Sequence, residues 1–459
     1  MHFEPTVESL RQYRCPEWFR DAKFGIYLHW GAYSVAERGE WYVRHMYMEG
    51  HPDSTHHRET WGHPSEFGYK DFVPLWRAEK WDPQRLVTLF KQAGARYFCP
   101  CAVHHDNFDL WDSKHHHWNS VDMGPKKDIT GLWRQAALEA GLRFGVTTHM
   151  ARTWSWINVN KGSDRFGPYK GVPYDGADPA YEDFYLPPHE DIDLRQGLNP
   201  PKSWRQTWLE RIQDLIDNYH PDHLYLDGAI PFQGDDDSQT GLEMLAYYYN
   251  QNATWHHGKQ QCVMCIKNVP NHGRYIPGVA TLDIERGRAD AILEDPWQTD
   301  TSIGPWGYRA GATYRSAGEI VHELVDIVSK NGNLLLNVPP KADGTLDNET
   351  EALLAEIGAW MDVNGEAIYA TRPWTVCGEG PLRYTRRGKT VYAIAIDWPG
   401  PGLEWSAPSL DLEAGQVENV ALVGSDLRPE WRQSREGLAI RLPRELPCEH
   451  AWAFRVTLM

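Results

Sequence analysis

The feature that most constrains this fold is a recurring order of a short apolar run, a polar loop and an amphipathic helix. Such an alternation is typical of parallel strands covered by helices. Strands are expected at residues 24–30, 96–103, 143–148, 223–227, 261–266, 280–285, 291–294 and 333–338. Helices are expected around 86–90, after the cap Asp128, and at 204–219, 241–250, 316–328 and 350–363. The pattern predicts an α/β fold with a (β/α)8-like barrel, with a doubly wound parallel sheet as the alternative.

The last part of the chain has a different period. After Asn364 the helical pattern disappears, and residues 390–396 and 452–458 alternate apolar and polar side chains between turns that contain Gly and Pro. A period of two indicates strands with one buried face. We therefore predict two domains, a catalytic barrel over residues 1–368 and a C-terminal β-sandwich over residues 369–459.

Charge and hydropathy exclude several classes of partner. The chain has 46 Lys and Arg against 63 Asp and Glu, a formal net charge of −17. Nucleic acids and anionic membranes both bind basic surfaces, so neither is expected as a partner. Neither a transmembrane run of about 18 apolar residues nor a signal peptide is visible. A cytoplasmic location is expected, or a secreted or periplasmic one if a leader was removed; the oligomeric state stays open.

Tryptophan is unusually abundant, with 22 residues in 459. Flat aromatic faces suit the apolar faces of sugar rings, and a buried indole N–H needs a partner, so a sugar-related role competes with simple anchoring of loops. The seven cysteines include Cys262-Val-Met-Cys265, but no second pair completes a zinc site. We interpret them as small buried thiols.

Polar residues recur where the predicted strands end, which is where a (β/α)8 enzyme carries its active site. Asp227 is the most distinctive, because it ends an apolar strand and is followed by Gly228, which permits close approach of backbone or ligand. A plain turn is the alternative. Glu285 is not distinguishable from Asp283 or Glu294 by its surroundings. The strand-end residues are His29, His104, His105, Asp106, His149, Asp227, Lys267 and Glu285.

The histidines allow a metal-dependent hydrolase as a rival. Such enzymes usually take two ligands from alternate positions of one strand, whereas His104 and His105 are adjacent and point to opposite faces unless the strand has ended. Neutral imidazoles that hold sugar hydroxyls fit better, so no metal is expected. The pairs at 56–57 and the run at 115–117 are interpreted as solvated turns.

Several long motifs resemble the α-L-fucosidases of glycoside hydrolase family 29, in the correct order. The resemblance runs from about residue 16 to about residue 375, and the β-rich tail agrees with the C-terminal domain of that family. The motifs are the segments 18–34, Gly39-Glu-Trp-Tyr42, 102–114, Gly124-Pro-Lys-Lys-Asp128, Tyr225-Leu-Asp-Gly228, Trp306-Gly-Tyr308 and 332–337.

The resemblance implies a retaining exo-glycosidase that removes terminal α-L-fucose from glycans or glycosides without a cofactor. Asp227 matches the nucleophile of the family, and Glu285 looks like the acid/base of those members in which Glu-Arg-Gly precedes Pro-Trp-Gln-Thr-Asp. Tyr225 stands where the family usually has Trp, and Lys267 lies where many members carry Arg. The implied substrate-binding residues are His29, Glu40, Trp41, His104, His105, Tyr225, Lys267 and Trp306.

Two other functions fit the same pattern. An α-L-galactosidase would differ only in the group that it accepts at C6 of the sugar. A sugar-binding protein on an inactive barrel would keep the histidines and tryptophans but lose a carboxylate, and the presence of Asp227 favours the enzyme.

Overall fold

The computed structural model describes residues 2–191, 199–269 and 272–459. Eight parallel strands form a closed barrel in chain order, which confirms the (β/α)8 prediction. The strands are β1 (Phe24–Leu28), β2 (Tyr97–Val103), β3 (Arg143–Thr148), β4 (His223–Leu226), β5 (Val263–Lys267), β6 (Thr281–Asp283), β7 (Trp297–Ser302) and β8 (Gly332–Asn337).

The strand predicted at 291–294 is wrong, because β7 begins only at Trp297. β7 reads Trp-Gln-Thr-Asp-Thr-Ser and is buried along its whole length. Hydropathy misses such a strand, because its polar side chains are buried through hydrogen bonds within the barrel. Gln298, for example, donates from Nε2 to Asp283 Oδ2 at 2.6 Å.

Helices cover the outside of the barrel and begin at the caps that the sequence indicates. Asp128 accepts a hydrogen bond from Gly131 N, and Ser316 with Glu319 forms a capping box. The long helices are α6 (Pro83–Gln92), α7 (Ile129–Glu139), α10 (Lys202–Tyr219), α11 (Gln239–Trp255), α12 (Ala317–Ser329) and α13 (Asn348–Asn364). Shorter helices are α1 (Val7–Leu10), α2 (Glu17–Ala22), α3 (Tyr42–His45), α4 (Pro52–Thr60), α5 (Tyr69–Phe72), α8 (Thr153–Ile157) and α9 (Glu182–Tyr185).

The C-terminal domain consists of two antiparallel sheets, as predicted. One sheet has the order β13-β16-β11-β10-β9 and the other β12-β15-β14, and a separate apolar core lies between them. Its strands are β9 (Arg372–Glu379), β10 (Leu382–Arg387), β11 (Thr390–Ala395), β12 (Glu404–Ala407), β13 (Val417–Leu422), β14 (Trp431–Ser434), β15 (Gly437–Arg441) and β16 (Trp452–Leu458). The predicted boundary at 368/369 falls between α13 and β9.

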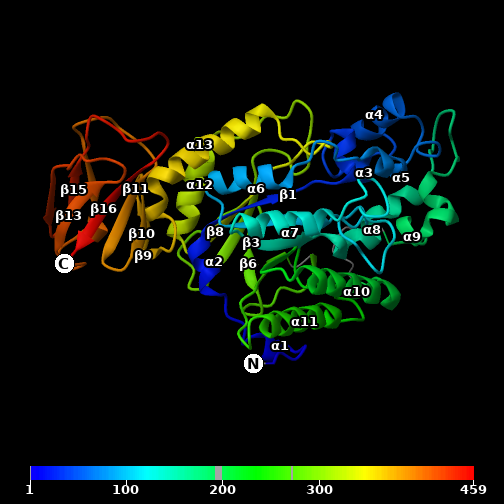
Figure 1. Ribbon diagram of the computed structural model, residues 1–459, viewed down its shortest axis with the longest axis horizontal. Coiled ribbons are helices and arrows are strands. Elements are labelled where there is room, and N and C mark those ends of the chain that lie inside the picture. The colour runs from blue at the N-terminus through cyan, green and yellow to red at the C-terminus, as the bar shows by residue number, and fades with distance from the viewer. Residues whose placement is uncertain (1, 192–198, 270–271) are drawn as a thin grey trace.

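The β-sandwich packs against α12 and α13. Trp360 of α13 donates its indole N–H to Ala451 O at 2.8 Å, and Arg383 of β10 lies 2.7 Å from Asp326 of α12. In Figure 1 the sandwich lies at one end of the molecule, while α3, α4, α5, α8 and α9 lie at the other. These short helices belong to the loops that follow β1 and β3, so the sandwich does not cover the carboxyl ends of the strands.

Two further expectations concern buried thiols and membranes. Cys99, Cys101, Cys262 and Cys265 are buried, whereas Cys15, Cys377 and Cys448 are half-buried, and all seven cysteines are free thiols. Within the described part of the chain, no helix combines the length and apolar character that crossing a membrane requires.

Candidate active site

A cavity of about 260 Å³ opens at the carboxyl ends of the barrel strands. It collects most of the residues predicted from the sequence, which come from seven different segments of the chain. Those that line it are His29, Glu40, Trp41, His104, His105, Asp227, Lys267, Glu285 and Trp306. Two predicted residues do not line it. Tyr225 is fully buried and its hydroxyl donates to Asp300 at 3.0 Å, and Asp106 is buried and accepts a hydrogen bond from the Tyr69 hydroxyl.

Lys267 joins the two predicted catalytic carboxylates. Its Nζ lies 2.6 Å from Asp227 Oδ1 and 2.6 Å from Glu285 Oε2. The two carboxylate oxygens are therefore no farther apart than twice 2.6 Å. The lysine is buried at the end of β5, whereas Glu285 lies on the loop after β6 with its side chain 42% exposed.

The charges around Asp227 keep it ionised. Burial opposes ionisation, but Lys267 and His149 together hold the pKa of Asp227 well below its usual range. His149 Nδ1 lies 3.2 Å from Asp227 Oδ2. Burial opposes protonation of that imidazole, yet Cys101 and Asp227 raise the pKa of His149 to about 10. An ionised carboxylate beside an imidazolium and an ammonium is suited to act as a nucleophile.

Three further histidines of the cavity, His29, His104 and His105, are neutral. Burial is the main cause that lowers the pKa of His29 to about 3 and those of His104 and His105 well below the usual range. His29 Nδ1 donates to Asn337 Oδ1 at 2.9 Å, and His105 Nδ1 donates to His149 O at 2.6 Å. Each of these two rings therefore keeps Nε2 as an acceptor.

His104 carries an unsatisfied polar atom. Its Nδ1 is buried and has no hydrogen-bond partner among the residues that the structure describes. A buried polar group without a partner is costly, so such groups are expected to be satisfied by a ligand or by water. Because β2 ends at Val103, the adjacent side chains of His104 and His105 both reach the cavity.

Sequence reasoning missed five residues that line the cavity, namely Tyr27, His149, Arg152, His272 and Asp300. His149 was recognised as a strand-end residue but received no role, and Arg152 lines the same wall. Asp300 lies within β7, where it accepts hydrogen bonds from Tyr27 at 3.1 Å and Tyr225 at 3.0 Å and lies 3.8 Å from Lys267. For Asp300, the only signal in the sequence is the Pro-Trp-Gln-Thr-Asp motif that ends at this residue.

A glycine brings two distant segments together at the rim. Glu40 is buried, and its Oε2 accepts a hydrogen bond from Gly307 N at 2.7 Å. A Cβ at position 307 would lie 2.8 Å from Glu40 N, which is closer than real Cβ contacts allow. The close approach places Trp306 beside His29, with their ring centroids 5.4 Å apart.

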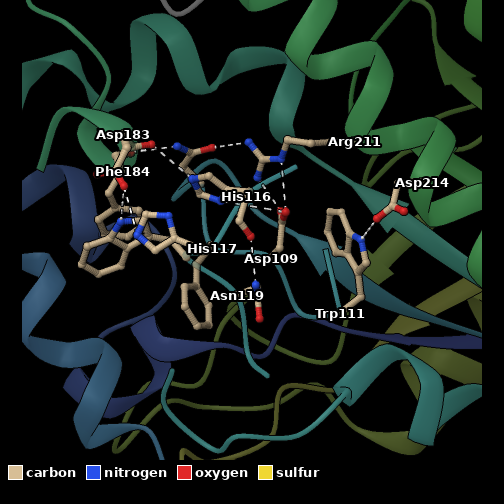
Figure 2. A network of polar contacts seen from close by, with 12 residues as sticks. Asp109, Trp111, His116, His117, Asn119, Asp183, Phe184, Arg211 and Asp214 are labelled. Carbon is tan, nitrogen blue, oxygen red and sulfur yellow. Dashed lines mark hydrogen bonds and ion pairs between the residues drawn. The ribbon is translucent and has the colours of Figure 1, made fainter. Parts of the chain in front are cut away.

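A buried polar network anchors the loop that follows His104 and His105 (Figure 2). Arg211 of α10 is fully buried, lies against Asp109 with Nε to Oδ2 at 3.2 Å, and donates from Nη1 to Asn107 Oδ1 at 2.7 Å. Asn107 and Asp109 follow His104 and His105 closely in the chain, so the network fixes the path by which the chain leaves β2.

The histidines at 56–57 and 115–117 were predicted to lie in solvated turns. That prediction is wrong for His57 and His116. The His116 side chain is 8% exposed and its Nε2 contacts Asp183 O at 3.2 Å, at the edge of the network in Figure 2. His57 is buried in α4, between the Tyr42 hydroxyl and Phe67 O, both at 2.8 Å. Both ring nitrogens of His57 therefore have partners from other parts of the fold, and the polar residues next to His57 in the sequence do not reveal this.

The cavity contains two groups of side chains that are close enough together to bind a metal ion. Ring nitrogens of His29, His104 and His149 lie within 4.8 Å of one another, as do His105, His149 and Asp227. Both sets include His149, which would have to lose its proton to act as a ligand. The nearby ammonium of Lys267 also opposes a second cation. The charges therefore suit a neutral ligand with hydroxyl groups better than a divalent ion.

Two carboxylates joined through one lysine, in a cavity walled by tryptophan and neutral histidine at the carboxyl ends of the barrel strands, are typical of a glycoside hydrolase. Comparison with known proteins agrees. The family model for "Alpha-L-fucosidase" matches residues 1–366, and that for "Alpha-L-fucosidase C-terminal domain" matches residues 378–457. The chain belongs to the α-L-fucosidase family, glycoside hydrolase family 29.

Individual relatives are similar over almost the whole chain. Tissue α-L-fucosidase of Rattus norvegicus is 30% identical, with 99% of this chain and 93% of that protein covered. Plasma α-L-fucosidase of Homo sapiens is 30% identical, with 99% and 92% covered. The crystal structure of Thermotoga maritima α-fucosidase in complex with fucose is 30% identical, with a TM-score of 0.77 and 99% and 100% of the two chains covered.

Proposed function

We propose that this enzyme hydrolyses terminal α-L-fucosides with retention of configuration, through a covalent glycosyl-enzyme on Asp227. The observation that carries the proposal is the single ammonium that contacts both carboxylates at 2.6 Å. Retaining glycosidases hold their two carboxyl groups about 5–5.5 Å apart, whereas inverting ones need about 6.5–9.5 Å to admit a water molecule. The upper bound set by Lys267 agrees with the retaining class.

Asp227 is placed to attack the anomeric carbon. It is held between Lys267 and His149 at the end of β4, and Gly228 after it has φ 138°, a conformation that favours glycine. A rigidly held nucleophile reduces the entropy lost on reaching the transition state. The bond from Asp227 to the anomeric carbon forms as the bond to the leaving oxygen breaks.

Glu285 acts as the acid and then as the base. It would give a proton to the leaving oxygen and later accept one from the water that hydrolyses the glycosyl-enzyme. An acid must be protonated, so its contact with Lys267 has to open when the sugar enters. Its position on a loop permits that movement, because its side chain is 42% exposed.

The neutral histidines bind the sugar hydroxyls in this proposal. Nε2 of His29 and Nε2 of His105 accept hydrogen bonds from sugar hydroxyls, and the buried Nδ1 of His104 gains a partner. Trp41 and Trp306 supply apolar surface for the ring and its C5 methyl group.

The stereochemistry of the first product tests the proposal. With a 4-nitrophenyl α-L-fucoside, NMR of the reaction at early times should show α-L-fucose before mutarotation. Initial β-L-fucose would contradict the retaining mechanism. A parallel panel with the α-L-galactoside and with β-D-glycosides distinguishes a fucosidase from an α-L-galactosidase, and binding of fucose without hydrolysis would instead support an inactive sugar-binding protein.

Chelation tests the metal-dependent rival. Dialysis against EDTA should leave the rate on the aryl fucoside unchanged. A loss of activity that zinc or manganese restores would assign His29, His104 and His149 to a metal site and remove them from sugar binding.

A further inference from the structure

We propose that the groove beside the fucose cavity is a subsite for the leaving group, and that it selects an acidic sugar carrying a carboxylate or a sulfate. The inference rests on the fucosidase function proposed above and names the class of substrate that this site prefers. The groove has a volume of about 410 Å³ and shares Glu40, Trp41 and Trp306 with the fucose cavity.

The position of the groove matches the side from which the leaving group departs. Glu285, the proposed acid, must lie next to the oxygen that leaves. The following residue, Arg286, lines the groove, and its guanidinium lies over the ring of Trp306 at 4.3 Å. The unit attached to fucose therefore extends over Trp306 toward Arg286 and away from the barrel axis.

The groove is basic in a chain whose net charge is −17. Three arginines line it, Arg38, Arg286 and Arg309, together with His45 and His51. Its two acidic residues are already engaged. Asp53 lies 2.7 Å from Arg38 and 3.3 Å from His45, and Glu40 accepts a hydrogen bond from Gly307 N.

Two of the arginines face each other directly. Arg38 and Arg309 are partners in an isolated antiparallel bridge, which is closed by hydrogen bonds from Gly39 N to Tyr308 O and from Ala310 N to Glu37 O, both at 2.9 Å. This pattern makes them a non-hydrogen-bonded pair, in which the side chains leave the same face at the closest spacing. Like charges in such a pair are destabilising. Asp53 already pairs with Arg38, so the guanidinium of Arg309 is the one of the two that is left for an anion to bind.

Arg286 and Arg309 lack acidic partners. Within residues 2–191, 199–269 and 272–459, neither forms an ion pair with a carboxylate. Arg286 donates to Gly304 O at 3.0 Å, and Arg309 is exposed. A guanidinium presents a planar fork of donors that matches a carboxylate or a sulfate, and charge-assisted bonds of this kind are stronger than neutral ones. The groove therefore offers an acidic sugar two guanidinium groups that no protein carboxylate occupies.

Matched substrates test the inference. Fucose is α-linked, through the same position, to galactose, to galacturonic acid and to 6-sulfogalactose, and kcat/KM is measured for each at low salt. Wild-type enzyme should prefer at least one acidic substrate by about tenfold over the neutral one, since a charge-assisted bond contributes on that scale. The preference should weaken as salt is raised. The two acidic arms show whether carboxylate or sulfate is recognised.

Variants locate the preference. Arg309→Ala should lower the ratio of acidic to neutral kcat/KM about tenfold, and Arg309→Lys should retain part of it. Because each ratio is taken within one variant, general effects on folding or turnover cancel. The matched control is Arg428→Ala, an exposed arginine of the β-sandwich that should leave the ratio at its wild-type value.

Each outcome decides the question. Equal hydrolysis of neutral and acidic fucosides by the wild type would overturn the inference and leave the fucosidase function intact. A preference that survives in Arg309→Ala at full size would also overturn it. No hydrolysis of any fucoside would overturn the proposed function and this inference with it.

Discussion

Lys267 is the residue on which the electrostatics of the site depend. Its Nζ contacts Asp227 and Glu285 and lies 3.8 Å from Asp300. Burial would lower the pKa of Lys267, but these carboxylates raise it, so the ammonium stays charged. In return it stabilises the ionised form of Asp227, which is the form that the proposed mechanism requires.

Removing the proposed nucleophile should abolish the reaction without unfolding the protein. We expect Asp227→Ala to lose activity on an aryl fucoside by roughly 10³-fold or more, because nucleophilic attack has no substitute. Azide should then attack the anomeric carbon directly and give a β-fucosyl azide, identified by NMR. A near-normal rate in this variant would exclude Asp227 as the nucleophile.

The leaving group tests Glu285. A general acid contributes most when the departing oxygen is basic. Glu285→Ala should therefore slow hydrolysis of natural fucosides much more than hydrolysis of a nitrophenyl fucoside, and azide should give the α-azide through the glycosyl-enzyme. The acid limb of the pH profile should remain, while the alkaline limb should flatten.

Two other glutamates serve as controls for Glu285. Glu40 is buried against Gly307 at the rim, and burial raises its pKa. Glu294 lines a different cavity, between the first residues of β6 and β7. If either Ala variant shows the dependence on the leaving group and Glu285→Ala does not, the acid/base assignment is wrong while that of the nucleophile stands.

The pH dependence tests the role of Lys267. Because its charge lowers the pKa of Asp227, Lys267→Met should raise that pKa and move the acid limb of kcat/KM to higher pH. Lys267→Arg keeps the charge and should keep the limb near its wild-type position. Circular dichroism checks that both variants are folded. An unmoved acid limb in folded Lys267→Met would contradict the electrostatic account.

At the scale of elements, the loop after β2 depends on a charge contributed by α10. Arg211 and Asp109 are both fully buried, and burial raises the pKa of Asp109 to about 6 even with Arg211 beside it. A buried charge that loses its partner is strongly destabilising. The loop that carries His104 and His105 is therefore held from behind, by a helix that contributes nothing to the cavity walls.

We expect Arg211→Met to lower the free energy of unfolding by about 3–5 kcal/mol, measured by urea denaturation. Lys114→Met is the matched control. Lys114 lies 3.4 Å from the buried Asp214, but its own side chain is 71% exposed, so the change should be within about 1 kcal/mol. Equal effects of the two substitutions would contradict the structural role of the buried pair.

At the scale of the whole molecule, the barrel and the β-sandwich share apolar packing. Tyr392 and Ile394 of β11, Ala451 just before β16 and Ala453 within it belong to the same buried cluster as the barrel residues. The sandwich also keeps a cluster of its own. Continuous packing of this kind couples the two domains when they unfold.

Calorimetry should therefore show one main unfolding transition. Trp360→Ala removes a buried indole and its hydrogen bond to Ala451 O, and should lower the free energy of unfolding by about 3–5 kcal/mol. Two transitions in the wild type, of which Trp360→Ala moves only one, would show that the domains unfold independently.

The local pattern of side chains determined the order of the elements and several positions of the site. Burial follows the periods of 3.6 and 2, so alternating strands and helices can be recognised from the chain itself. Asp227 and Lys267 were identifiable because each lies where an apolar run ends. β7 was not, because its polar side chains are buried through partners on other strands.

Closure of the barrel decided the distances between those positions. It brings Lys267 to Asp227 and Glu285, adds His149 and Asp300, and places Tyr225 beneath the cavity instead of in its wall. It also sets Arg38 opposite Arg309, from segments far apart in the chain. A chain records which residue ends each strand, but the separation of two strand ends depends on how all eight strands pair around the barrel.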